Sequence, residues 1–242
     1  MGVVIKRRAI VAGGNPRMKV PVTGIQAGTL AVGSVVKLME GGAAVEYLVV
    51  NQGIPSNSSL YDASCDGTWL LRKDCHSKRA WNTSNINNYE TSAINNWLNG
   101  DFFNSFGSVE QAAIKQVKIP YGKGSGSSSI TSGASGLPVK IFLLGYAELE
   151  ITGISSHMVD GATLAYFSGA ADSDRVAMLN GATAFWFTRS TYSGNSSRVY
   201  SITFSGGAGW GNASDLSDIR PALVIPKTAL FDASTLILKG AA

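Results

Sequence analysis

The pattern of apolar and polar positions predicts many short strands and few helices. Two apolar runs, 35–38 and 45–50, are separated by Glu40-Gly41-Gly42, which is typical of a β-hairpin. In the region 198–204, alternation places Tyr200, Ile202 and Phe204 on one face, which we expect to be buried. Other short apolar runs predict further strands at 68–71, 139–144, 184–187 and 222–225.

Helices are predicted at three places. In 91–98, apolar residues recur at helical spacing, and Asn99-Gly100 is expected to end that helix. Ser108-x-x-Gln111 has the spacing of a capping box and predicts a helix over 109–116. A third short helix is expected at 172–179. The Gly/Ser-rich stretch 122–136 fits either a linker or a surface loop, and we favour a loop because a strand resumes at Val139.

Composition supports this picture and narrows the class of protein. The chain has 242 residues, of which 15% are charged, 45% are hydrophobic and 28 are glycine. This balance argues against a coiled coil, a helical bundle and a disordered chain. No apolar run reaches the roughly 20 residues that a membrane-spanning helix needs, so no membrane insertion is expected. We therefore predict an α+β fold that is rich in strands and loops.

Positive charge is concentrated at the N-terminus. Five basic residues and no acid occur among the first 19 residues; removing these five charges from the net charge of +4 leaves −1. The rest of the chain therefore lacks the basic face expected of a nucleic-acid-binding protein. Residues 1–32 are interpreted as an anchoring arm, with a solvated tail as the alternative, and 33–242 as one domain. The anchoring residues are Lys6, Arg7, Arg8, Arg17 and Lys19.

Nothing in the sequence predicts catalytic or metal chemistry. Acidic residues are scattered, and His76 and His157 show no spacing to serine or aspartate that indicates a catalytic triad. Cys65 and Cys75 form no Cys-x-x-Cys motif, so no zinc site is expected, while their pairing in a disulfide stays open. We also find no signal peptide and expect synthesis in a cytoplasm. The protein is predicted to be neither an enzyme nor a holder of a cofactor or metal.

Residues typical of binding loops gather near the C-terminal end. Tyr, Trp, Ser, Asn and Gly combine rigid aromatic contact with adaptable hydrogen bonding, as binding loops require. Ordinary polar turns around one buried Trp are the alternative. We expect the ligand-binding loops at about 190–218, with ligand-binding side chains from Tyr192, Asn195, Ser197, Arg198, Trp210, Asn212 and Asp215.

Several sequence motifs, in order, carry a family resemblance. They include Cys65-Asp66-Gly67-Thr68-Trp69-Leu70-Leu71, Lys78-Arg79-x-Trp81, Ile94-x-x-Trp97-Leu98-Asn99, Trp186-Phe187-x-Arg189-Ser190 and Ile219-Arg220-Pro221-Ala222-Leu223. Together, across about 33–230, they resemble a family of uncharacterised domains of gut Gram-positive bacteria and their phages. The C-terminal motifs are similar to those of C-type-lectin-like domains of the formylglycine-generating-enzyme kind.

The resemblance implies a C-type-lectin-like fold, with two or three short helices, and a binding role. It implies that Trp186, Arg189, Arg220 and Pro221 brace the core, and with them we place Trp69, Trp81 and Trp97 there. The Glu-Pro-Asn motif of calcium-dependent sugar-binding lectins is absent, as is the catalytic cysteine pair of the formylglycine-generating enzymes. The resemblance therefore does not imply calcium-dependent sugar binding or that enzyme's chemistry.

These observations together predict a phage virion protein that displays a host-binding domain. The expected ligand is a glycan or a protein of the host surface. The arm would attach to other virion proteins or to neighbouring copies, and a homo-oligomer is expected. A tail or fibre adhesin and a capsid decoration protein fit equally. A bacterial diversified binding protein with no virion role is the alternative, and an enzyme is the third class.

Overall fold

The computed structural model describes residues 24–56 and 59–241. The five residues expected to anchor the arm lie outside this part of the chain. Within it, no helix is long and apolar enough to cross a membrane. The architecture is rich in strands and has few short helices, so the predicted α+β class is confirmed at this level.

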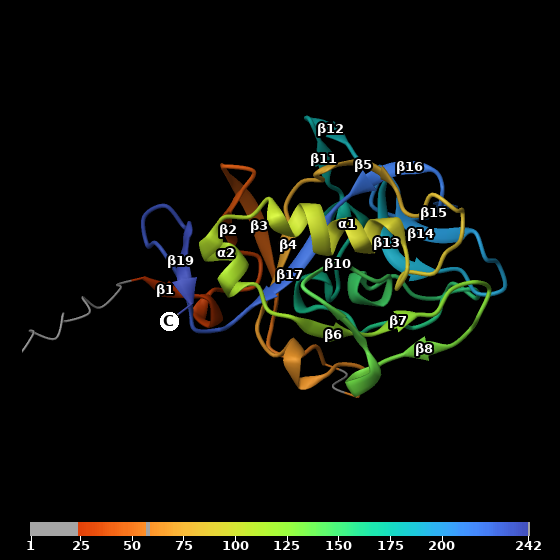
Figure 1. Cartoon of the computed structure of the whole chain (residues 1–242), viewed down its shortest axis with the longest axis horizontal. Helices are drawn as coiled ribbons and strands as arrows, with labels where there is room; N and C mark the ends of the chain where they lie inside the picture. The colour runs from red at the N-terminus through yellow and green to blue at the C-terminus, as the bar shows by residue number, and fades with distance from the viewer. Residues whose placement is uncertain (1–23, 57–58, 242) are drawn as a thin grey trace, which may run out of the picture.

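Two five-stranded sheets form the body of the protein, the first on the left of Figure 1 and the second on the right. The first is antiparallel, with the order β10-β17-β4-β3-β2. Its strands are β2 (Val35–Glu40), β3 (Ala43–Gln52), β4 (Thr68–Arg72), β10 (Ile141–Leu143) and β17 (Pro221–Ile225). The predicted hairpin is therefore confirmed as β2 and β3.

The second sheet has the order β15-β14-β13-β16-β5, and only its β13–β16 pair is parallel. Its strands are β5 (Ser77–Ala80), β13 (Trp186–Thr191), β14 (Arg198–Ile202), β15 (Ala208–Asn212) and β16 (Leu216–Ile219). Because β14 ends at Ile202, Phe204 falls in the turn to β15 and is 58% exposed. The expectation that Phe204 is buried was wrong.

The chain passes from one sheet to the other by short connections between β4 and β5 and between β16 and β17, and these two connections are neighbours. Arg220 lies at the second passage. Its Nε and Nη2 donate to the carbonyls of Arg72 (3.0 Å) and Lys73 (2.9 Å) at the first. Pro221 follows and is paired with Leu143 of β10. Arg220 and Pro221 thus hold the junction between the two sheets.

A three-stranded sheet and three two-stranded sheets complete the β-structure. Residues 24–32, expected to belong to the arm, are part of this folded body. Ala27 is fully buried and the amide of Gly28 donates to the carbonyl of Lys227 (2.9 Å), so the folded body begins no later than Gly24. The three-stranded sheet consists of β1 (Ile25–Gln26), β18 (Ala229–Phe231) and β19 (Leu238–Ala241). The two-stranded sheets pair β6 (Val117–Ile119) with β9 (Leu137–Val139), β7 (Tyr121–Gly122) with β8 (Ile130–Thr131), and β11 (Met178–Leu179) with β12 (Ala182–Thr183).

The helices are short, and several of their predicted bounds are wrong. The helix predicted over 109–116 stops at Ala113, and the one predicted over 172–179 is a 3-10 helix over Asp172–Arg175 followed by β11. α1 (Ala93–Trp97) does not stop at Asn99-Gly100 but continues as a π-helix over Leu98–Phe102. α2 (Ser108–Ala113) has Gly107 at its N-cap without a side-chain bond, and Gln111 Nε2 donates back to the Phe106 carbonyl (2.8 Å). No capping box forms there. The remaining turns are 3-10 helices at Ala27–Thr29, Ala63–Cys65, Gly133–Ser135, Ala147–Leu149, Ala165–Phe167 and Asp172–Arg175.

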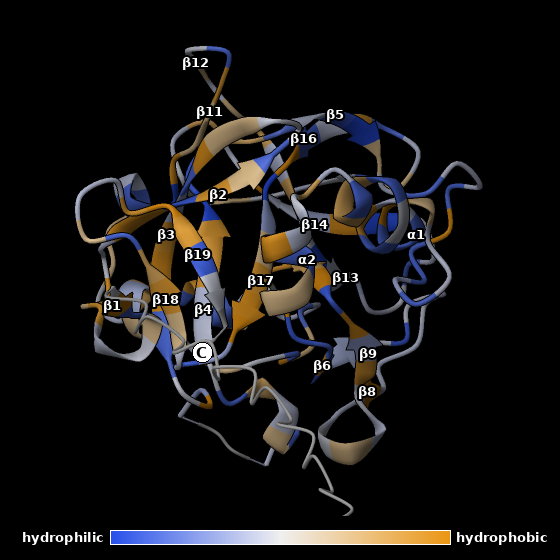
Figure 2. Ribbon diagram, turned by 60° about the vertical axis from the view of Figure 1, so that its left-hand side comes forward, coloured by the Kyte–Doolittle hydropathy of each residue, from blue (hydrophilic) through white to orange (hydrophobic). Residues whose placement is uncertain are grey.

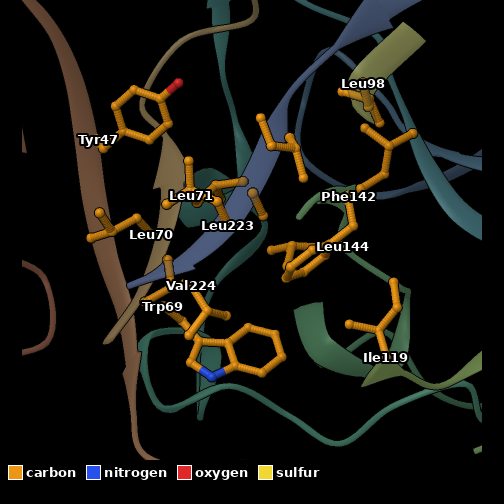
Figure 3. Packing of buried hydrophobic residues seen from close by; sticks show 14 of the residues in the cluster. Tyr47, Trp69, Leu70, Leu71, Leu98, Ile119, Phe142, Leu144, Leu223 and Val224 are labelled. Carbon is orange, nitrogen blue, oxygen red and sulfur yellow. The ribbon is translucent and has the colours of Figure 1, made fainter. Parts of the chain in front are cut away.

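The core lies against the first sheet and extends to the second. In Figure 2, hydrophobic residues are concentrated along the central strands of the first sheet. Figure 3 shows Trp69 and Val224 near Phe142 and Leu144; the rings of Trp69 and Phe142 meet edge to face at 5.5 Å. Three of the tryptophans expected in the core, Trp69, Trp81 and Trp186, are fully buried. Trp97 is only partly buried, and the Arg79 guanidinium lies 3.9 Å from the centroid of its ring.

Candidate functional site

The seven residues expected to bind ligand lie at one end of the second sheet, in β14, β15 and the adjoining turns. We call this set the Arg198–Trp210 surface. Cross-strand pairing joins Arg198 to Asn212 and Tyr200 to Trp210. Opposite residues of an antiparallel pair share a face of the sheet, so the four side chains point the same way. The surface consists of Tyr192, Asn195, Ser197, Arg198, Trp210, Asn212 and Asp215.

Rings and one guanidinium form a continuous stack across this face. Arg198 Cζ lies 3.9 Å from the centroid of the Trp210 ring and 5.7 Å from that of Tyr192. The Tyr192 ring in turn stacks on Tyr200 at 5.1 Å and 20°. Trp210 is 50% exposed, and the guanidinium of Arg198 makes no hydrogen bond or ion pair with any residue in 24–56 or 59–241. The stack therefore fixes a cation that keeps all its donors free.

Three of the seven side chains shape the turns instead of facing a ligand. Asn195 Oδ1 accepts hydrogen bonds from the amides of Ser197 (2.9 Å) and Arg198 (3.0 Å), and from Ser197 Oγ (3.0 Å). Asp215 Oδ2 accepts from the Asn212 amide (2.8 Å). Local bonds of this kind are the usual role of Asn, Ser and Asp in turns. The side chains left for a ligand are those of Tyr192, Arg198, Trp210 and Asn212.

Asn87 organises the surface from beneath and was not expected to do so. It is fully buried, and its Nδ2 donates to the carbonyls of Asn195 (2.8 Å) and Arg198 (2.7 Å). Its Oδ1 accepts from the amide of Ser125 (2.6 Å). One amide thus ties together three loops that are far apart in sequence. The only sequence signal was the place of Asn87 in the polar stretch 82–90.

Gly124 belongs to the same arrangement. Its φ is +68°, and a Cβ there would lie 1.8 Å from the Asn87 carbonyl oxygen. Only glycine fits so close an approach with a left-handed backbone. The Gly-x-Gly-x-Gly run that begins at Gly122 therefore serves the packing of this loop on Asn87, and a strand, β8, follows it rather than a helix.

A groove of about 620 Å³ adjoins the stack. Its wall is the segment 151–163, joined to the surface where the amide of Ser193 donates to the Ser156 carbonyl (3.0 Å). The His157 ring lies 5.6 Å from that of Tyr200. Ile154 and Val159 supply apolar lining, and Val159 is 63% exposed. The groove extends the accessible area beyond the predicted loops.

Below the groove lies a buried ionic cluster. Arg189 and Glu148, both without side-chain exposure, pair through two bonds, Nη1–Oε2 at 2.5 Å and Nη2–Oε1 at 2.8 Å. The remaining donors of Arg189 reach the carbonyls of Pro120 (2.9 Å), Leu143 (3.0 Å) and Asp160 (2.6 Å). Burial alone would lower the pKa of Arg189, but the Glu148 carboxylate raises it above its usual value. This cluster is saturated internally.

Ser190, Asp160 and His157 lie together but not in the order of a catalytic triad. Ser190 Oγ donates to Asp160 (3.0 and 2.9 Å) and accepts from the Tyr146 amide (2.8 Å). His157 Nε2 lies 3.4 Å from Asp160 Oδ1. In a triad the imidazole lies between serine and carboxylate and removes the serine proton. Here the carboxylate lies between the two, so the arrangement orients the loop rather than activating Ser190.

The two cysteines are free and buried. Burial raises the pKa of the Cys65 thiol to about 11 and that of Cys75 to about 12, so both stay protonated at neutral pH. The thiolate is the reactive form of cysteine. Among the residues in 24–56 and 59–241, no group of three or more His, Cys, Asp or Glu side chains could hold a metal ion.

The comparison with known protein families gives one match. A family described as a domain of unknown function (DUF6273) matches residues 66–227, from just before β4 to just after β17. No curated protein and no solved structure matches the chain. The matched region takes in the second sheet, the ionic cluster and the whole Arg198–Trp210 surface, and it spans more than half of the chain. The protein therefore belongs to the DUF6273 family.

Proposed function

We propose that this protein is a ligand-binding display module whose Arg198–Trp210 surface contacts a glycan or protein of a host surface. One observation carries the proposal: Trp210 is half exposed, and the guanidinium of Arg198, stacked on it, makes no hydrogen bond or ion pair with any described residue. A large exposed aromatic beside an unpaired guanidinium is typical of the anchors of binding interfaces.

The chemistry of the surface indicates the kind of ligand. A guanidinium offers five donors in one plane and matches carboxylate or phosphate groups with two parallel bonds. The indole of Trp210 offers an apolar face to a sugar ring or an apolar side chain. Asn212 adds an amide that both donates and accepts. The surface thus fits a ligand that carries an anionic group next to a ring or apolar patch.

The setting we propose is a phage virion, with the domain of C-type-lectin-like kind. Support comes from the sequence motifs that resemble such domains and from a strand-rich body with long irregular loops. The basic N-terminal segment would attach the domain to other virion proteins or to a neighbouring copy, in a homo-oligomer. A role as a bacterial binding protein without a virion is the alternative.

Binding to bacterial surfaces tests the surface itself. Labelled protein is mixed with cell walls from a panel of gut Gram-positive bacteria, and bound protein is measured for wild type, Trp210→Ala and Arg198→Ala. We expect each variant to lose at least tenfold in affinity, while its unfolding temperature falls by no more than about 4 °C. Phe204→Ala is the matched control, since Phe204 is equally exposed but outside the stack. Equal binding by all four proteins, or none to any wall preparation, would refute the proposed surface.

Mass spectrometry of particles from the producing strain tests the setting. Detection with a copy number in the hundreds supports a capsid decoration protein, and a few to a few dozen copies support a tail or fibre adhesin. Absence from particles would replace the virion role with the cellular one. Deletion of residues 1–20 should abolish incorporation without unfolding the domain, and normal incorporation of that variant would reject the anchor.

A further inference from the structure

A second cleft, of about 610 Å³, shares no residue with the Arg198–Trp210 surface. It lies where α1 and the π-helix face β9 and the residue that follows it. Its lining is unusual because half of the lining residues carry side-chain amides and none of them is an acid. The amides are those of Asn95, Asn96, Asn99, Asn104 and Gln116.

The π-helix gives this cleft its shape. Asn99 and Gly100 lie within Leu98–Phe102, and Phe103 and Asn104 follow directly. A π-helix packs its backbone less favourably than an α-helix, is rare, and occurs frequently at functional sites. Gly100 sits at the cleft, and a Cβ at this position would meet nothing within 4 Å. The widened turn and the missing side chain together keep the cleft open.

The amides divide into a rigid wall and an unbonded rim. Asn99 is saturated: its Oδ1 accepts from the amides of Lys140 (2.8 Å) and Ile141 (3.2 Å), and its Nδ2 donates to Asn95 Oδ1 (3.0 Å). By contrast, the exposed side chains of Asn96, Asn104 and Gln116 make no hydrogen bond to any described residue. The cleft therefore has three unbonded side-chain amides at its rim and one amide, that of Asn99, fixed in its wall.

One cation completes the lining. Lys140 Nζ lies 4.0 Å above the centroid of the Phe103 ring, which holds the ammonium at the cleft. Lys140 is the only charged residue among the described ones that line it. A cation–π contact of this kind orders the lysine but leaves its three N–H donors free for another partner.

We propose that this amide cleft is a second binding site and that it takes a saccharide carrying a carboxylate, such as a uronic acid unit. Sugar hydroxyls both donate and accept hydrogen bonds, as amides do, so three free amides can each serve a hydroxyl. The carboxylate pairs with the Lys140 ammonium in a charge-assisted bond. No acid is among the lining residues, so the carboxylate meets no like charge within the lining itself.

The test is an NMR titration of the full chain labelled with nitrogen-15. The probes are trisaccharides of galacturonate, guluronate and mannuronate and a hyaluronan tetrasaccharide, with the methyl ester of trigalacturonate as the uncharged match. We expect the side-chain amide signals of Asn96, Asn104 and Gln116 to shift with at least one acidic probe. The uncharged ester should bind about fivefold more weakly, the size of a partly exposed charge contact.

Two variants and two controls tie the shifts to the cleft. Gly100→Phe fills the open space and should abolish the shifts, while Gly100→Ala should keep them. Lys140→Gln should remove the preference for the acid over the ester. In Trp210→Ala the side-chain amide signals of Asn96, Asn104 and Gln116 should still shift with the acidic probes, whatever happens at the proposed host-binding surface, which separates the two sites.

Several outcomes would overturn the proposal. The first is the absence of shifts with every acidic probe at 10 mM. The second is equal affinity for the ester and the acid. The third is a set of shifts that survives Gly100→Phe or moves to the Arg198–Trp210 surface. Loss of binding in Gly100→Phe counts as support only if its backbone spectrum outside the cleft matches that of wild type.

Discussion

Arg189 and Arg198 lie on neighbouring strands, β13 and β14, yet they have opposite surroundings. Arg189 is fully buried, and its guanidinium donates hydrogen bonds to Glu148 and to three backbone carbonyls. Arg198 is partly exposed, rests on Trp210 and makes no such bond with a described residue. A saturated guanidinium stabilises the fold, whereas an unsaturated one held on an aromatic ring is available to a ligand. The two arginines therefore separate the structural part of the sheet from the part that can bind.

The strongest test of this difference breaks the buried pair. Glu148→Gln removes the carboxylate that is hydrogen-bonded to the buried Arg189 guanidinium, and breaking a buried pair in this way typically costs 3–5 kcal/mol. We expect a loss of about that size in the free energy of unfolding, measured by urea denaturation. Glu46→Gln is the control, because its pair with Lys73 (2.7 Å) is exposed and should contribute less than about 1 kcal/mol. Equal effects of the two substitutions would contradict a structural role for the buried pair.

We expect removal of the Asn87 side chain to lower the free energy of unfolding by an intermediate amount. Asn87→Ala deletes an amide that bonds three loops and leaves their carbonyls unpaired, so we expect a loss of about 2–3 kcal/mol. Hydrogen exchange should also speed up at 124–126 and 192–198. Asn96→Ala removes an exposed, unbonded amide and should change the stability by less than about 0.5 kcal/mol. Unchanged exchange in those loops would show that Asn87 does not hold them.

Low pH should remove the stability that the buried Asp160 carboxylate contributes to the fold. Burial alone would raise the pKa of Asp160, but hydrogen bonds from His157 and Ser190 and the charge of Arg189 lower it below its usual value. A carboxylate with a lowered pKa in the folded state stabilises the fold at neutral pH and loses this contribution as the pH falls through that pKa. Asp160→Asn should thus be less stable than wild type at pH 7, and the gap should close below about pH 4. A constant gap from pH 7 to pH 2.5, measured by urea denaturation at each pH, would reject this linkage.

The smallest effect on stability is expected at the exposed arginine. Arg198→Ala removes a partly exposed cation–π contact, worth about 0.5–1 kcal/mol. Its unfolding free energy should fall by no more than that, while binding to bacterial walls falls at least tenfold. A loss of stability above about 2 kcal/mol would make Arg198 a structural residue like Arg189, and the distinction between them would fail.

Local signals in the sequence were sufficient for some elements and insufficient for others. The β2–β3 hairpin was predictable because its turn and its apolar runs are adjacent in sequence. The π-helix was not, because Asn99-Gly100 normally ends a helix, and the bonds that Asn99 accepts from Lys140 and Ile141 come from more than 40 residues away in sequence. Similarly, the capping box does not form because the helix takes Gly107 instead of Ser108 as its N-cap, and the Gln111 side chain donates to the Phe106 carbonyl.

The candidate surface was predictable in its composition but not in its construction. The residue types of 190–218 indicated binding loops, and the structure gathers all seven residues at one end of the sheet. The division of labour among them depends on contacts that no spacing reveals. Asn195 is taken up by its own turn, while Asn87 acts across 108 residues of sequence. Long-range bonds of this kind are decided by the tertiary fold.

The junction at Arg220 has a consequence for how the chain assembles. Arg220 bonds to Arg72, 148 residues earlier, and β17 pairs with β4 beside it. During synthesis, neither five-stranded sheet can close until the segment that carries β16 and β17 has left the ribosome. Folding of the two sheets is therefore expected to wait for this segment and to be slow, as for other topologies dominated by contacts distant in sequence. Truncations that remove β16, β17 and the residues after them should yield chains that aggregate rather than smaller folded fragments.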